Sequence, residues 1–510
     1  MTEYIIRHGN RHMMLRPIIL KHRISSKLLS SKLSTSKLVL AQPEWALFER
    51  MEYANKLYNH PTPINYTNQQ KQFEKRRQTI IAIADNDFTE NTLVSAIKSL
   101  RNSGGEIHLP AGALVLENTL KITQGISLKG INGRTELVFK DCDYGISIQG
   151  TVGNKLDQVG IHDIRLCHQG DNRFCAALFA SHTQALHLEN IVIISPRAVG
   201  ILLADQVYQT KLINCRVQHA GLVGFMFIRD VIETLMTNCS AEYCQQSGIF
   251  LTDLKLPDDI DPLDFSAQLD YTNHTIGNFA PFAADDPSPY RTDIIDCVFS
   301  HNRKMGITTD GVAYLKVVNC VLAHNDCEGI TIDNGAWGCS IQNCHIFSNG
   351  WRGLQHVAEL GADYVSEMGL MEDGSSKAKL PGVSLDNAAY TRVENNHIEC
   401  NWGDGIKLVR AAYESSITGN LIENNNRGMN DKFHYFGILI GVAKRQHCNQ
   451  YDFASCNNYI GTNTILGEHF SGIHLMAHVT GNTVEKNSVS GASCQSIEVH
   501  ALFGNMLVGT

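Results

Sequence analysis

The chain has 510 residues, of which 43% are hydrophobic, and it carries a formal net charge of −8. This acidic balance provides no basic surface for nucleic acid, so we expect no nucleic-acid partner. No apolar run reaches the roughly 18 residues that a membrane-spanning helix requires, so we expect no transmembrane segment.

Residues 1–43 differ in composition from the rest of the chain. Eight Lys or Arg stand against one acid, Glu3, and the stretch Ser26–Leu38 repeats Ser-Lys-Leu three times. A basic, Ser-rich and acid-poor start is typical of a targeting segment or a disordered arm. The apolar stretch Met13–Leu20 contains Arg and Pro, so it makes a poor secretory signal. We therefore expect 1–43 to be a disordered arm or a targeting segment.

Residues 44–103 are predicted to form a helical cap and linker. Glu44–Asn59 and Gln69–Ile83 have the apolar spacing of helices, and Phe88–Leu100 is predicted as a third helix with Asp87 as its N-cap. The open apolar end of a solenoid must be covered. The first two helices are expected to contribute to that cover.

From residue 104 onward the chain is repetitive. Small polar or sulfur side chains recur at about 24-residue steps or at longer, interrupted ones, and most are preceded by a β-branched run and followed by Gly-apolar-x-apolar-x. Such short units cannot bury an apolar face alone, so they must stack. We predict a parallel β-helix of about eleven coils over 104–504, with insertions at 254–290, 360–387 and about 427–456. The recurring positions are Asp163, Asn190, Cys215, Cys239, Cys297, Cys320, Cys344, Asn396, Asn420, Asn463 and Asn487.

Five of these positions are cysteines, out of fifteen in the chain. One cysteine per coil is explained by packing in a narrow internal column, so these thiols are expected to be free and shielded. Free thiols favour a reducing compartment.

The beginning of the repeat array carries a family resemblance. After the third predicted helix come Gly104-Gly-Glu-Ile-His-Leu-Pro-Ala-Gly112 and then Ile126-Ser-Leu-Lys-Gly-Ile-Asn-Gly133. This order resembles the opening of the pectate-lyase-like β-helix superfamily, which includes polysaccharide lyases, polygalacturonase-type hydrolases, mannuronan C5-epimerases and phage tailspikes. The resemblance implies an all-β, right-handed parallel β-helix and a polysaccharide or oligosaccharide partner. It leaves the reaction open, because one scaffold hosts many sites.

Strand alternation indicates which side chains leave the coil. The first and third residues after each Gly are expected to point inward, and the second and fourth outward. Outward polarity is concentrated in the middle coils, where two aspartates occupy one column on consecutive coils, about 4.8 Å apart at the backbone. The outward polar residues are Thr308, Asp310, Thr331, Asp333, Gln355 and Lys407.

Three functions fit this pattern. The first is hydrolysis of a uronic-acid-containing polysaccharide by the pair Asp310 and Asp333, since two close carboxylates can act as acid and base. The second is a lyase or C5-epimerase in which Lys407 or Arg352 is the base and the Asp pair holds Ca²⁺. The third is a non-catalytic carbohydrate-binding or interaction solenoid. The expected substrate-binding residues are Thr308, Thr331, Gln355, Asp404, Trp351 and Trp402.

The hydrolase hypothesis has partial motif support. Thr309-Asp310-Gly311, Asn325-Asp326-Cys327 and Gly405-Ile406-Lys407 loosely resemble motifs of polygalacturonase-type hydrolases. The first Asp of one motif is replaced by Asn325, and Arg352 stands where a Gly-His-Gly would be expected. A structural role remains open for the Asp pair, in which each carboxylate caps the end of its strand.

Overall fold

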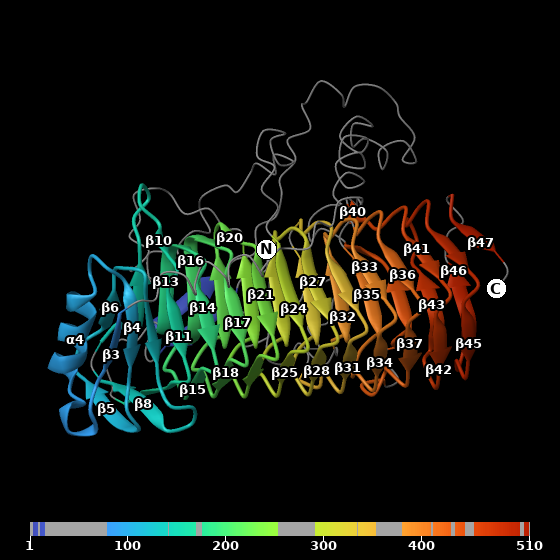
Figure 1. Ribbon diagram of the computed structural model, residues 1–510. Helices are drawn as coiled ribbons and strands as arrows, with labels where there is room; N and C mark the ends of the chain where they lie inside the picture. Colours follow the sequence, from blue (N-terminus) through green and yellow to red (C-terminus); the bar gives the residue numbers. More distant parts are fainter. Residues whose placement is uncertain are drawn as a thin grey trace.

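The computed structural model describes residues 4–8, 11–15, 79–140, 142–169, 176–252, 291–333, 335–352, 380–409, 412–429, 434–443, 453–499 and 504–508. Three long parallel sheets run along one elongated body, and strands of the same sheet come from successive turns of the chain (Figure 1). This arrangement is a right-handed parallel β-helix, as predicted. Among the described residues, no helix is long and apolar enough to cross a membrane.

Sheet 1 carries the candidate site. Its strands are β6 (Leu120–Ile122), β9 (Tyr144–Gln149), β13 (Ala176–Gln184), β16 (Val199–Tyr208), β19 (Phe225–Ile228), β23 (Ile249–Thr252), β26 (Ile307–Asp310), β29 (Ile330–Asp333), β32 (Val383–Asp386), β35 (Ile406–Val409), β38 (Ile438–Ile440), β43 (Ser471–Leu475) and β46 (Gln495–Val499), with β10 (Leu156–Asp157) and β20 (Val231–Ile232) beside this path.

Sheet 2 extends to both ends of the body. Its strands are β3 (Ile80–Ala82), β4 (Gly105–His108), β7 (Ile126–Lys129), β11 (Gly160–His162), β14 (His187–Glu189), β17 (Lys211–Ile213), β21 (Thr234–Thr237), β24 (Thr292–Ile295), β27 (Leu315–Val318), β30 (Ser340–Gln342), β33 (Arg392–Glu394), β36 (Ser416–Thr418), β41 (Tyr459–Gly461), β44 (Thr483–Glu485) and β47 (Met506–Val508).

Sheet 3 completes each coil. Its strands are β5 (Gly112–Leu116), β8 (Thr135–Phe139), β12 (Arg165–His168), β15 (Val192–Ile194), β18 (Arg216–Gln218), β22 (Ser240–Glu242), β25 (Val298–Ser300), β28 (Val321–Ala323), β31 (His345–Phe347), β34 (His397–Glu399), β37 (Leu421–Glu423), β42 (Thr464–Leu466) and β45 (Ser488–Ser490). Two short antiparallel pairs stand apart from the three sheets: β1 (Tyr4–His8) with β2 (Arg11–Leu15), and β39 (Val442–Ala443) with β40 (Phe453–Ala454).

The N-terminal end of the body is covered by α4 (Glu90–Ser99), the only α-helix within the described residues (Figure 1). Its face of Leu93, Ala96 and Ile97 is buried in the main core. The predicted N-cap Asp87 was wrong: Asp87 ends the short 3₁₀ helix η1 (Asp85–Asp87), and the Thr89 hydroxyl accepts the N–H of Thr92 instead. Thr89 precedes the first helical residue, which is the position that an N-cap requires.

The predicted helix Gln69–Ile83 was wrong at its end, because residues 80–82 form β3, which pairs with β4 and starts sheet 2. The rest of that helix and the predicted helix Glu44–Asn59 lie outside the described residues, as does most of the arm 1–43. The β-helix therefore begins earlier than residue 104.

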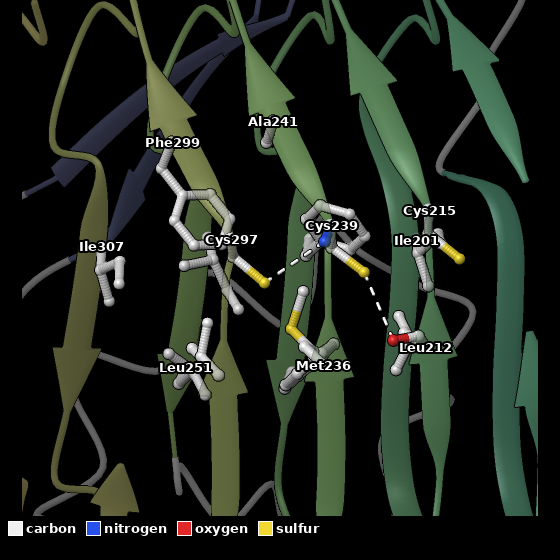
Figure 2. Packing of buried hydrophobic residues seen from close by; sticks show 14 of the residues in the cluster. Ile201, Leu212, Cys215, Met236, Cys239, Ala241, Leu251, Cys297, Phe299 and Ile307 are labelled. Carbon is white, nitrogen blue, oxygen red and sulfur yellow. Dashed lines mark hydrogen bonds between the residues drawn. The ribbon is translucent and has the colours of Figure 1, made fainter. Parts of the chain in front are cut away.

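The predicted cysteine column lies inside the coil. Cys215, Cys239 and Cys297 follow one another on successive coils, are at most 1% exposed and are free thiols. Figure 2 shows Cys297 Sγ accepting the backbone N–H of Cys239 at 3.3 Å, and Cys239 Sγ donating to the Leu212 carbonyl at 3.4 Å. Further along, the Cys344 N–H is accepted by Asn396 Oδ1 at 2.8 Å, so asparagine continues the column.

Two members of the predicted column were placed one residue out of register. Asn190 lies beside Asn214, since its Oδ1 accepts Asn214 Nδ2 at 3.0 Å, and Asp163 accepts Asn190 Nδ2 at 2.8 Å. Asp163 and Asn190 both have positive φ, a conformation that Asn and Asp tolerate better than most residues. The turn position and the internal position are adjacent in the sequence, as in Asn214 and Cys215, and both recur with the same spacing. The spacing between repeats therefore cannot show which of the two positions a residue occupies.

A second internal column was not predicted. Asn302, Asn325, Asn349, Asn401 and Asn425 lie on consecutive coils, and each is fully buried. In each step, the Oδ1 of one asparagine accepts both the backbone N–H and the side-chain N–H of the asparagine before it, at 2.7–3.1 Å. The column thus satisfies polar groups at a turn that water cannot reach.

Candidate functional site

Sheet 1 brings three aspartates together at the ends of consecutive strands. Asp333 is paired with Asp386 in the β29–β32 register, and the carbonyl oxygen of Asp333 accepts the N–H of Gly311, the residue after Asp310, at 3.1 Å. The backbone neighbourhood predicted for Asp310 and Asp333 is therefore present. Asp386 extends that pair to a row of three carboxylates.

A second row lies two residues earlier on the same strands. Thr308 is paired with Thr331, Thr331 with Ser384, and Ser384 with Lys407. We call the two rows together the outer strip. It consists of Thr308, Asp310, Thr331, Asp333, Ser384, Asp386 and Lys407.

The predicted insertion 360–387 was wrong at its C-terminal end. Residues 383–386 form β32 and supply the coil between β29 and β35. Gln355 was expected in this coil, but it lies outside the described residues, and Ser384 occupies the position beside Thr331. Similarly, β38 lies within the predicted insertion 427–456, while 254–290 falls outside the described residues.

Ile307, Ile330 and Ile406, which were predicted to point inward, are 0% exposed and belong to the main hydrophobic core. The outward side chains are nevertheless mostly buried as well, with Asp333 and Asp386 each 3% exposed. Within the strip, Thr308 Oγ1 lies 2.8 Å from Ser247 Oγ, and Asp310 Oδ2 accepts the Thr252 hydroxyl at 3.4 Å.

Two further carboxyl groups lie where these strands begin. Glu328 directly precedes Gly329, Asp404 directly precedes Gly405, and they are 6% and 5% exposed. Burial raises the pKa of Glu328 to about 7 and that of Asp404 to about 6, although the nearby Lys407 ammonium lowers both. The Asp386 carboxylate acts in the opposite direction and raises the pKa of Glu328. Glu328 is therefore partly protonated at neutral pH.

Sequence reasoning missed Glu328 as a site residue and assigned Asp386 to an insertion. The signal for Asp386 was present, because Gly382-Val-Ser-Leu-Asp386 matches the pattern of Gly329-Ile-Thr-Ile-Asp333. Glu328 and Asp404 share the position directly before the repeat glycine. That position lies outside the alternating strand positions from which outward residues were predicted.

Arg352 and Trp351 lie together beside a different carboxylate. Arg352 Nε is 3.2 Å from Asp326 Oδ2, Trp351 Nε1 donates to Asp326 Oδ1 at 2.5 Å, and the guanidinium stands over the indole ring. Burial raises the pKa of Asp326, whereas Arg352 and the Trp351 hydrogen bond lower it. Trp402 lies on the next coil, with its backbone N–H donated to the Asn349 carbonyl.

Calcium was predicted at Asp310 and Asp333 for the lyase or C5-epimerase hypothesis. In the part of the chain that the structure describes, two groups place three or more possible metal-ligand atoms within 4.8 Å of one another. Neither group includes a residue of the outer strip.

The raised pKa of Glu328 predicts a stability change with pH. In the unfolded chain this carboxyl titrates near its ordinary value of 4.5, so between pH 4.5 and 7 the folded chain holds the extra proton. The stabilisation is complete below about pH 4.5 and is lost as the pH rises through 7, by on the order of 3 kcal/mol. Urea midpoints at pH 4.5 and 7.5 should therefore differ less in Glu328→Gln than in the unsubstituted chain.

A matched control is Glu117→Gln, because the Glu117 side chain is 59% exposed. Burial lowers the pKa of His469 to about 4, so this group makes stability rise with pH between about 4 and 6.5. That opposite trend is common to all three chains and cancels in the comparison. If the urea midpoint changed by the same amount between pH 4.5 and 7.5 in Glu328→Gln and in Glu117→Gln, the raised pKa of Glu328 would be contradicted.

Comparison with known proteins supports the fold. The family model described as "Periplasmic copper-binding protein (NosD)" matches residues 273–432. The A-module of a mannuronan C-5 epimerase from Azotobacter vinelandii has 15% identity and a TM-score of 0.50, over 86% of this chain and 99% of that one. Tailspike protein 3 of bacteriophage CBA120 has 12% identity and a TM-score of 0.53, over 86% of this chain and 62% of that one.

A search of curated proteins found no match. At these identities the similarity concerns the fold alone. The chain has a right-handed parallel β-helix, as the sequence predicted.

Proposed function

We propose that the chain is a carbohydrate-active enzyme that hydrolyses a uronic-acid-containing polysaccharide on the outer strip of sheet 1. The observation that carries this proposal is that strand β29 has a buried carboxyl group with a raised pKa, Glu328, just before its start and the carboxylate of Asp333 at its end. Glu328 has a pKa of about 7, and the row of Asp310, Asp333 and Asp386, which we call the Asp row, lies at the ends of β26, β29 and β32. Glycoside hydrolysis needs one carboxylic acid and one carboxylate on either side of the scissile bond.

In this mechanism Glu328 protonates the leaving oxygen, and the pair Asp310 and Asp333 supplies the base or nucleophile. Burial keeps Glu328 protonated until neutral pH, which is the condition for a general acid. Asp386 favours the protonated form of Glu328, because a like charge nearby opposes its ionisation. The role of Asp386 in this proposal is to keep Glu328 protonated, so that Glu328 can act as the general acid.

In this proposal the other predicted site residues bind the substrate. The Lys407 ammonium holds a uronate carboxylate, and the hydroxyls of Thr308 and Thr331 bond to sugar hydroxyls. One protein of similar fold has "mannuronan" in its name, which supports an acidic polysaccharide as the substrate class. Asp404, Trp351, Trp402 and Arg352 are proposed as further substrate contacts, as is Gln355, which lies outside the described residues.

A second candidate function is abstraction of the C5 proton by a lyase or epimerase. Lys407 favours it, because it lies near both Glu328 and Asp404 and interacts electrostatically with each. Lys407 would remove the proton, and a protonated carboxyl nearby would return one in an epimerase. Ca²⁺ at the Asp pair belongs to this hypothesis alone.

Product analysis separates these functions. The full chain is incubated with polyuronates and neutral glucans, and the products are followed by reducing ends, ultraviolet absorbance of unsaturated uronate, and NMR of the uronate configuration. Hydrolysis predicts new reducing ends without absorbance, and indifference to chelator. Absorbance would overturn hydrolysis in favour of a lyase, and inverted C5 without cleavage would favour an epimerase. Tight binding with no product in any assay would favour a binding solenoid.

A further inference from the structure

Sheet 3 carries a cluster of histidine and glutamate side chains that the proposed function does not use. His345 on β31 is paired with His397 on β34, and Glu399 on β34 is paired with Glu423 on β37. The residues between them, such as Ile346 and Ile398, are 0% exposed and form the core. Strand alternation therefore puts the His and Glu side chains on the outer face of three consecutive coils.

The polar atoms of this cluster converge. His345 Nε2 lies 2.8 Å from Glu399 Oε1, and His397 Nε2 lies 3.9 Å from Glu399 Oε2. His397 Nε2 is also 2.8 Å from Glu423 Oε2. The two imidazole rings are stacked, with centroids 4.9 Å apart and planes within 7°. Glu399 thus places one oxygen toward each histidine.

We propose that His345, His397 and Glu399 bind one divalent ion of the Zn²⁺ and Cu²⁺ class, with Glu423, whose Oε2 lies 2.8 Å from His397 Nε2, as a fourth ligand. One ligand atom from each of the first three residues lies within 4.8 Å of the others. A shared ion with bonds of about 2.0–2.2 Å requires ligand atoms up to about 4 Å apart, so small rotations of the side chains close the site. Two imidazoles with carboxylate oxygen favour this class of ion over Ca²⁺ or Mg²⁺, which prefer all-oxygen sites.

Access distinguishes this cluster from the similar group His162, His187 and Glu189 on sheet 2. The side chains of His345 and His397 are 41% and 38% exposed, whereas those of His162 and His187 are 10% and 18% exposed. An ion reaches the first pair from solvent without disturbing the coil. The exposed side chains also have room to rotate toward a shared ion.

The chain contains a natural comparison for the ring stacking. His301 and His324 are stacked on consecutive coils with centroids 4.9 Å apart, as in the proposed site. Their other ring contacts are with Tyr243 and Phe347, and neither histidine belongs to a group of possible ligand atoms among the described residues. Substituting this pair removes two stacked histidines without removing the proposed ligands.

The test measures ion binding to the full chain. Chelator-treated protein is titrated with Zn²⁺ by calorimetry and equilibrium dialysis, in the unsubstituted chain, in His345→Gln/His397→Gln, and in His301→Gln/His324→Gln. The first double variant should bind one ion fewer per chain, and the second should match the unsubstituted chain. Glu399→Gln keeps both histidines and should weaken that one ion by about 100-fold, since even an outer partner of a ligand is worth about 10–100-fold.

Cu²⁺ provides a spectroscopic readout. Its paramagnetic resonance spectrum should show coupling to two nitrogens, and this signal should be lost in His345→Gln/His397→Gln but kept in His301→Gln/His324→Gln. Circular dichroism establishes that each variant is folded. Equal Zn²⁺ stoichiometry and affinity in all the folded variants would overturn the proposal and reduce the cluster to His–Glu pairs that link adjacent coils.

Discussion

Replacing Asp333 by Asn is expected to lower kcat on the cleaved polysaccharide by about 10²–10⁴-fold, the usual contribution of a positioned acid or base. The substitution keeps the size and polar shape of a side chain that is 3% exposed, and it removes the charge that the proposed chemistry uses. The backbone N–H of Asp333 is accepted by the Thr309 hydroxyl at 3.1 Å, and this contact survives the change. Asp310→Asn should have an effect of the same order.

A matched control is Asp296→Asn. Asp296 is exposed and has a φ of 56°, a conformation that Asn also tolerates. Its kcat should equal that of the unsubstituted chain. Thermal unfolding of all three variants separates loss of activity from loss of structure. If a folded Asp333→Asn chain kept the full kcat, the catalytic role would be contradicted, and the Asp row would have only a structural role at the strand ends.

The fold was predictable because each coil repeats a local pattern. The sequence Gly-Ile-Thr-Ile-Asp after Glu328 contains both the turn and the alternation of a strand, so burial follows residue by residue. Eleven predicted positions correspond to eleven consecutive strands of sheet 2, from β11 to β44. The start at Ile80 was missed because the apolar spacing of Gln69–Ile83 was interpreted as a helix, whereas residues 80–82 form β3.

The site was less predictable for two physical reasons. Long insertions interrupt the period, so the sequence from Gly353 to Val357 was assigned to the coil between β29 and β35 that β32 occupies. The pKa of Glu328 also depends on burial and on Asp386 and Lys407, which are 58 and 79 residues away in the sequence. Sequence patterns predict which residues face outward, but they do not predict how deeply a carboxyl group is covered.

The internal asparagine column has the largest expected effect on stability, and Asn401 is its test position. Asn401 Oδ1 accepts both the backbone N–H and the side-chain Nδ2–H of Asn349 at 3.0 Å, and its own Nδ2 donates to Asn425 Oδ1 at 2.7 Å. Asn401 is 0% exposed, as is Asn349. In Asn401→Ala the two Asn349 donors lose these acceptors in a place that water cannot reach.

Each buried donor left without an acceptor costs about 1–3 kcal/mol, so Asn401→Ala should lower the free energy of unfolding by about 3–5 kcal/mol.

The matched control is Asn487→Ala. Asn487 makes the equivalent pair of contacts to Asn463 at 3.0 and 2.9 Å, but it is only half-buried and lies near the C-terminal end of its column, where water can replace the amide. Denaturant midpoints and melting temperatures should fall far more for Asn401→Ala. Because a solenoid can unfold in parts, the transition is followed both by circular dichroism and by tryptophan fluorescence. Equal losses at the two positions would mean that the amide contacts contribute little, and that the column is held by the packing of the aliphatic coil around it.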